Sequence, residues 1–225
     1  MARMRKDVNR GLLRRGLAGL ALLAAATVVL GALARLALHS GSFDRFDALV
    51  GVRTPVSERM RSLAAGISSL AGALFATVIS ALFAALLLAR RRFAESLVQV
   101  GSGLSAVIAQ DLLREWVGRA PPSDGLGMQT GSFPSSHVFF AMAVYGLFAY
   151  FVIRSVRAPG RRLATSLAAA LLVGLVAWSR LALGTQQLTD VLGGLVLGLV
   201  WVAVGAWVTA YRPPHGRSLN FRRHR

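Results

Sequence analysis

The amino-acid sequence predicts an all-α protein, a bundle of six transmembrane helices with both termini on the cytoplasmic side. The chain is 55% hydrophobic and only 16% charged, whereas soluble domains carry about 25% charged residues. Long apolar runs are separated by short basic segments. The net charge of +17 therefore indicates membrane topology and not nucleic-acid binding, because cytoplasmic loops of membrane proteins collect Lys and Arg.

Each apolar run is close to the roughly 20 residues that a helix needs to cross a bilayer. The runs cover residues 17–38, 63–89, 96–113, 137–153, 163–183 and 188–211. The first is longer than the core of a signal peptide, so we expect it to be retained. We expect one membrane domain, 17–211, between a basic N-terminus, 1–16, and a basic tail, 212–225.

Two of the connecting segments have a character of their own. Residues 39–61 are mixed in composition, and Phe43, Phe46 and Val50 suggest a short amphipathic piece on the membrane surface. Residues 114–136 are rich in Gly and Pro, which predicts neither helix nor strand.

The positive charges fix the expected orientation. Of 26 Lys and Arg residues, 18 lie in the four segments that six spans place on one side: 1–16, 90–92, 154–162 and 212–225. The positive-inside rule assigns that side to the cytoplasm, and we expect the plasma (inner) membrane. The loop 114–136 and the turn between the last two spans then share the extracytoplasmic face.

Polar residues gather at this face. Ser135, Ser136 and His137 open the fourth run, and Arg180 and Asp190 flank the last turn. Taken one at a time, the serines are explained as an ordinary helix N-cap and His137 as an ordinary polar residue. Arg180 and Asp190 are charges that are costly to bury in a membrane. Together they favour an anion site, in which free N–H groups at a helix start and a planar guanidinium hold phosphate. Asp190 is expected to orient a group in the turn or to pair with Arg180.

The spacing of the last turn resembles the type 2 phosphatidic acid phosphatase family, which shares its core with vanadium haloperoxidases. The third signature of that family, Ser-Arg-x5-His-x3-Asp, is matched by Ser179, Arg180 and Asp190. The resemblance covers roughly residues 60–210 and includes the six-span layout.

The second signature, Pro-Ser-Gly-His, is matched by Pro134, Ser135 and His137, with Ser136 at the Gly position. The resemblance implies roles by position. His137 corresponds to the general acid, Arg180 to a phosphate clamp and Asp190 to the carboxylate that orients the nucleophile. Ser135 and Ser136 fall in the phosphate-binding segment.

The nucleophile position departs from the family, because Gln186 stands where the attacking histidine belongs. A carboxamide cannot form the phosphohistidine on which the family mechanism depends. The other histidines are His39, in the first loop, and His215 and His224, in the tail.

The first signature, Lys-x6-Arg-Pro, has also lost a cation. An ungapped alignment puts Arg114 at the Lys position and Pro121 at the Arg position. An alternative alignment takes Arg119 as the signature Arg, and then Leu112 replaces the Lys. We expect Arg114 and Arg119 to be phosphate-binding candidates.

Three functions remain open from the sequence. The first is binding of a lipid phosphate or diphosphate, polyprenyl or glycerolipid, with hydrolysis impaired or absent. The second is an active lipid phosphate phosphatase with a substitute mechanism, using water activated by His137 or the Thr185 hydroxyl. The third is a structural or partner-binding membrane protein with a relic pocket. A single inactivating substitution is disfavoured, because Gln187 and Leu188 also depart from the family pattern.

The absence of other site motifs from the sequence limits the kinds of ligand that we expect. The sequence has no cysteine, no metal-ligand cluster and no Gly-rich nucleotide loop, so we expect no cofactor and no metal. The lipid bilayer and a membrane lipid phosphate are the expected partners, nucleic acid is not, and the sequence names no protein partner. Gly194 and Gly198 are expected to allow close helix packing inside the bundle, in preference to dimerisation.

Overall fold

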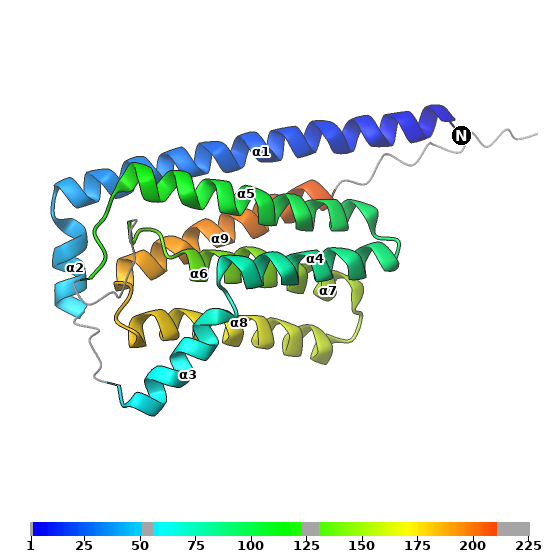
Figure 1. Cartoon of the computed structure of the whole chain (residues 1–225). Coiled ribbons are helices and arrows are strands. Elements are labelled where there is room, and N and C mark those ends of the chain that lie inside the picture. The colour runs from blue at the N-terminus through cyan, green and yellow to red at the C-terminus, as the bar shows by residue number, and fades with distance from the viewer. Residues whose placement is uncertain (1, 51–55, 123–130, 211–225) are drawn as a thin grey trace, which may run out of the picture.

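The computed structural model describes residues 2–50, 56–122 and 131–210, and within these ranges the secondary structure is entirely helical. The predicted all-α class is therefore confirmed. Figure 1 shows an elongated bundle of roughly aligned helices, with α3 set obliquely to the rest.

Five spans are long and apolar enough to cross a membrane among the described residues. Four are single helices or their apolar part: α1 (Ala2–His39), α5 (Phe93–Val117), α8 (Pro159–Ala182) and α9 (Leu188–Thr209). The fifth is a continuous helix made of α6 (Ser136–Phe140), η1 (Ala141–Gly146) and α7 (Leu147–Ser155).

The run predicted as one span at 63–89 is instead two helices, α3 (Glu58–Ser69) and α4 (Ala73–Ala89), bent by 47°. Counting this pair as one span gives the predicted six. Gly72 adopts extended backbone as the N-cap of α4. The Leu70 carbonyl at the break accepts a hydrogen bond from the Tyr145 hydroxyl. The break is thus stabilised by the neighbouring span, a contact that hydropathy alone does not reveal.

The two ends of the bundle differ as the charge pattern predicts. The start of α1, the α4–α5 connection at 90–92 and the α7–α8 connection lie at one end (Figure 1). The opposite end carries α2 (Ser42–Val50), the start of α6 and the α8–α9 turn. The polar residues singled out in the sequence therefore share one end of the molecule.

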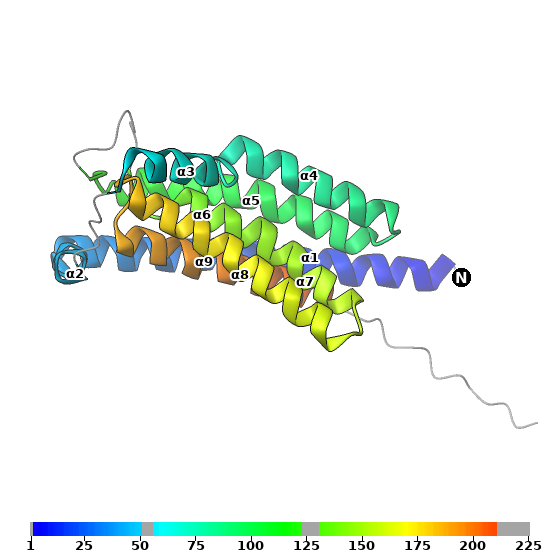
Figure 2. The same cartoon turned by 90° about the horizontal axis from the view of Figure 1, so that it is seen from below.

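The short amphipathic piece expected near Phe43 is helix α2, which lies across this end (Figures 1 and 2). Its Phe43 ring packs against Phe133, with centroids 5.3 Å apart, while Leu49 is 86% exposed. One face of α2 is thus fixed on the bundle.

The chain termini complete the comparison with the predicted domains. Helix α1 begins at Ala2, so most of the basic segment 1–16 continues the first span as helix. The tail 212–225 lies outside the described residues.

Helix α9 packs closely against α6 and η1 through glycines. A Cβ atom on Gly194 would lie 2.6 Å from the Ser135 carbonyl oxygen, and one on Gly198 would lie 2.4 Å from Met142 Cβ. Both distances are shorter than van der Waals contact allows. The glycines therefore serve packing within the chain, as expected, and bring the start of α6 against α9.

The segment η1 is a π-helix, whose turns are wider than those of the α-helices on either side. It begins four residues after His137. Its residues Ala141, Ala143 and Val144 are buried, so the wide turn lies inside the bundle, directly behind the end that carries the polar residues.

Candidate functional site

The predicted site residues come from four elements that meet at one end of the bundle. Arg114 lies in the last turn of α5, and Arg180 lies in the last turn of α8. His137 is in the first turn of α6 and Asp190 is in the first turn of α9. The prediction that the loop begins at 114 is wrong, because α5 continues to Val117.

Arg114, His137 and Arg180 form what we call the cation group. Arg114 Nη2 donates to Ser136 Oγ at 3.1 Å, and Ser136 Oγ lies 3.3 Å from His137 Nδ1. Arg180 is buried and its Nη1 donates to Ser68 Oγ at 2.9 Å. The charges of both arginines act on His137. Three residues far apart in sequence are thus placed around one point.

Hydrogen-bonding capacity remains unused beside the cation group. Arg114 Nε and Ser135 Oγ are buried, and neither has a hydrogen-bond partner among the described residues. Buried polar atoms of this kind cost about 1–3 kcal/mol each when they stay unsatisfied. An anion with several acceptor oxygens would satisfy donors of this kind.

The start of α6 is held in place by its neighbours. The Ser135 N–H donates to the Asp190 carbonyl at 2.9 Å, and Gln110 Nε2 donates to the Pro134 carbonyl at 3.1 Å. Because the Ser135 amide is used by α9, its hydroxyl is the group that Ser135 offers to a ligand.

Arg119 lies just after α5, beyond the αL residue Gly118 that ends the helix. Its guanidinium makes ion pairs with Asp190 at 2.8 Å, Asp47 at 2.8 Å and Asp44 at 3.2 Å. It also donates to the side chains of Gln187 and Thr189. We call these six residues the Arg119 network.

The network keeps Arg119 charged. Burial by itself would lower the pKa of Arg119, but the charge of Asp190 and the hydrogen bonds to Asp47, Asp190 and Asp44 outweigh burial and raise the pKa above its ordinary value. The Phe43 ring lies 5.1 Å from the guanidinium carbon and adds a cation–π contact. Since phosphate would be repelled by the three carboxylates, this geometry favours Arg119 as their partner and not as a phosphate ligand.

Asp190 is fully buried, and both of its carboxylate oxygens are held by neighbouring groups. Its Oδ1 pairs with Arg119, and its Oδ2 accepts from the Gln187 backbone N–H at 3.0 Å. The second bond is half of a capping box between Gln187 and Asp190 at the start of α9. The sequence predicts that Asp190 contacts either a group in the turn or Arg180. The contact seen is with the turn, through the backbone N–H of Gln187.

Gln186 lies in the α8–α9 turn and is 4% exposed. Neither its Oε1 nor its Nε2 has a hydrogen-bond partner among the described residues. The neighbouring Thr185 hydroxyl donates to the Arg180 carbonyl at 3.3 Å, so the hydroxyl considered as a substitute nucleophile is bonded within its own turn.

Several residues of the site were not found from the sequence. Asp47 and Ser68 reach it from α2 and α3, across 142 and 112 residues of chain, and no local pattern marks such contacts. Gln187 had a usable signal, because a polar N-cap followed by an acidic residue three positions later is a capping-box spacing.

The arrangement suits anion binding. Within the described ranges, no three His, Asp or Glu side chains are placed to hold a metal ion together. What the geometry offers is a pair of guanidinium groups, an imidazole and serine hydroxyls, which are donors suited to phosphate oxygens.

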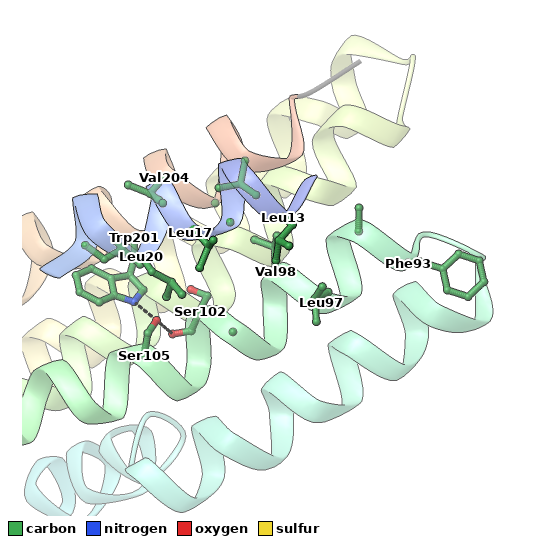
Figure 3. Close-up of a pocket in the computed structure, with 17 residues that line it drawn as sticks. Leu13, Leu17, Leu20, Phe93, Leu97, Val98, Ser102, Ser105, Trp201 and Val204 are labelled. Atoms are coloured by element: carbon green, nitrogen blue, oxygen red, sulfur yellow. Dashed lines mark hydrogen bonds between the residues drawn. The ribbon is translucent and has the colours of Figure 1, made fainter. Parts of the chain in front are cut away.

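A separate cavity of about 590 Å³ lies toward the other end of the bundle, between α1, α5 and α9 (Figure 3). Its walls are apolar apart from Ser102 and Ser105, and Trp201 Nε1 donates to Ser105 Oγ at 3.1 Å. No charged side chain of the described residues lines it, so it is distinct from the cation group.

Comparisons with known proteins agree on one family. A model described as the PAP2 superfamily matches residues 104–214. Phosphatidylglycerophosphatase B of Bacillus subtilis (strain 168) is 35% identical over 92 residues, which are 40% of this chain and 45% of that protein. The match therefore spans less than half of that relative.

The fold is similar to a solved structure, the crystal structure of the first transmembrane PAP2 type phosphatidylglycerolphosphate phosphatase from Bacillus subtilis. The TM-score is 0.73 at 22% identity, over 85% of this chain and 98% of that one. At this identity the similarity establishes the shared fold.

Proposed function

We propose that this chain binds a lipid phosphate head group at the cation group, with hydrolysis impaired or absent, because residues 104–214 match the PAP2 superfamily model and the fold is similar to that of a PAP2 type membrane phosphatase. The lipid is a polyprenyl or glycerolipid phosphate or diphosphate. The site faces the extracytoplasmic side of the plasma membrane, the side opposite the basic connections.

The observation that carries this proposal is the meeting of Arg114 and Arg180 at His137, beside buried donors that lack acceptors. Two like charges at the end of a membrane bundle repel each other, and an anion between them would remove that cost. A phosphate dianion supplies both the charge and the acceptor oxygens. The apolar tail of a lipid then extends along the spans into the bilayer.

Impaired hydrolysis follows from position 186. Gln186 has no nucleophilic imidazole, and losing the nucleophile of a covalent mechanism costs many orders of magnitude in rate. Among the described residues the other histidine besides His137 is His39, whose ring lies 2.7 Å from the Arg35 carbonyl of its own helix. The absence of a nucleophilic imidazole at position 186 supports the proposal that His137 has no covalent step to assist.

Binding is tested with the full chain reconstituted in nanodiscs. Labelled phosphatidic acid is titrated into wild type and into Arg114→Ala and Arg180→Ala, with Arg45→Ala as a control for an exposed arginine at the same end. We expect saturable binding that both site variants weaken and the control preserves. Equal binding by all four proteins would instead support the relic-pocket alternative.

Hydrolysis is tested by phosphate release from phosphatidic acid, phosphatidylglycerol phosphate and a prenyl diphosphate. We expect no release above background for wild type and a large gain for Gln186→His. Family-like turnover by wild type that is lost in His137→Ala would overturn the impairment and favour the substitute mechanism. Mass spectrometry of the lipid that co-purifies identifies the head group independently.

A further inference from the structure

We propose that Asp47 of α2 is a positioning residue for the phosphate site, because it holds Asp190 on Arg119 and away from the cation group. This inference rests on the proposed function, since it explains how the cation group stays open to a lipid phosphate. The motif comparison assigns Asp47 no role, and α2 lies outside the segment 104–214 that matches the family.

Asp47 makes three contacts that tie two elements together. Its Oδ2 accepts from Arg119 Nη2 at 2.8 Å and from Thr189 Oγ1 at 2.6 Å, and its Oδ1 accepts from the Thr189 backbone N–H at 3.0 Å. The side chain is only 10% exposed. One carboxylate from α2 thus fixes both the guanidinium of Arg119 and the first turn of α9.

The contact with Thr189 is a helix cap supplied from another element. The first N–H groups of a helix have no partner within it, and negative charge is favourable there. Asp47 satisfies the N–H of Thr189, which is adjacent to Asp190. Fixing this turn therefore also fixes the position of Asp190, whose carbonyl in turn receives the Ser135 N–H.

The network also sorts the charges. Arg119 pairs directly with Asp190, whereas the charges of Asp111 and, after it, Asp190 act on Arg114. If the ion pair between Arg119 and Asp190 were broken, Asp190 would be free to pair with Arg114 instead. An Asp190–Arg114 pair would cancel the positive charge on which phosphate binding depends. The Arg119–Asp190 ion pair therefore keeps the cation group electropositive.

Asp44 provides an internal comparison. It also contacts Arg119 Nη2, at 3.2 Å, but its side chain is 71% exposed. Exposed ion pairs contribute little because water and salt screen them. The two acids of α2 touch the same guanidinium nitrogen, and of the two only Asp47 is mostly shielded from solvent and reaches α9.

The test is titration of labelled phosphatidic acid into the full chain in phosphatidylcholine nanodiscs. Asp47→Asn preserves shape and removes the charge, and we expect it to weaken binding by about 5- to 150-fold, the usual range for coupling between sites. Asp47→Glu should recover most of the affinity. Asp44→Asn should have a much smaller effect, and the exposed Glu115→Gln should have none.

A second variant distinguishes the electrostatic effect of Asp190 on Arg114 from a general loss of structure. In Asp47→Asn combined with Asp190→Asn, the Asp190 carboxylate can no longer pair with Arg114, while Asp111, whose charge also acts on Arg114, is unchanged. We therefore expect tighter phosphatidic acid binding than in Asp47→Asn alone. A purely structural role for Asp47 predicts weaker binding still. If Asp47→Asn does not fold, Thr189→Val removes the hydroxyl that Asp47 accepts from and should weaken binding in the same direction.

The outcomes are distinguishable. Wild-type binding of phosphatidic acid together with unchanged binding by Asp47→Asn overturns this inference and leaves the proposed function standing. A double variant that binds more weakly than Asp47→Asn also overturns it. Absence of binding by wild type itself overturns the proposed function.

Discussion

Arg119 and Asp190 form a buried ion pair, with Nη1 and Oδ1 2.8 Å apart and side chains 4% and 0% exposed. In the family pattern that this chain resembles, the carboxylate at the Asp190 position orients the attacking histidine. Here residue 186 is glutamine and the carboxylate is held by an arginine and a helix cap. The same acidic position is therefore occupied by contacts that hold the start of α9 to Arg119.

Replacing Arg119 by methionine should destabilise the protein by about 3–5 kcal/mol, because Asp190 would be left buried without its counter-charge. Thermal unfolding in detergent micelles measures the change. Adding Asp190→Asn should recover part of the loss. The control is Arg45→Met at an exposed position of α2, which should unfold at nearly the wild-type temperature; equal losses at both positions would contradict the prediction.

Arg119→Lys should make stability depend on alkaline pH. The carboxylates would raise the pKa of the lysine above its unfolded value of about 10.4. The stabilisation is then fully present below that unfolded pKa and is lost as pH rises through the higher folded pKa. Unfolding temperatures at pH 8, 10 and 11 should fall for the variant at the highest pH. Wild type should show no such loss from this position, because the network raises the pKa of an already strongly basic group; parallel profiles would count against the prediction.

Gly194→Ala should destabilise the protein by about 1–3 kcal/mol and displace the start of α6, because the new methyl group would collide with the Ser135 carbonyl. It should also weaken phosphatidic acid binding. Gly174→Ala in α8, where nothing lies within 4 Å, is the matched control and should be neutral or stabilising. Denaturation midpoints compare the two, and equal midpoints would argue against close packing at Gly194.

The expected membrane orientation can be tested by labelling, because the chain contains no cysteine. Ser40→Cys lies at the end with α2, and Arg157→Cys lies in the α7–α8 connection; both positions are exposed. A membrane-impermeant maleimide added to intact cells should label the first and spare the second. The reverse pattern would place the cation group on the cytoplasmic side.

Much of the fold could be predicted because membrane spans are encoded locally, in hydropathy and flanking charge. The run 63–89 shows the limit of that signal. Its composition is apolar overall, and at the break the Leu70 carbonyl accepts a hydrogen bond from the Tyr145 hydroxyl. A contact between residues 75 positions apart leaves no trace in a hydropathy pattern.

The site divides in the same way. His137, Arg180 and Asp190 could be predicted as candidates from spacing, because each signature is confined to a short segment of the chain. The role of Arg119 depends on Asp47, which lies 72 residues earlier in the chain. The sequence showed that Arg119 is a cation near the site, but it did not show that three carboxylates would surround it.

The π-helical segment η1 separates the fourth span into two parts, α6 at the end with the polar residues and α7 at the opposite end. In an α-helix each residue turns the helix by about 100°, so a wide turn resets the angular phase between His137 on one side and Phe151 on the other. Phe151 is fully buried in a cluster with Leu87 and Leu147. A one-residue insertion or deletion within η1 would therefore rotate the end that carries His137 by about 100° relative to the buried Phe151 cluster, without changing the contacts of that cluster.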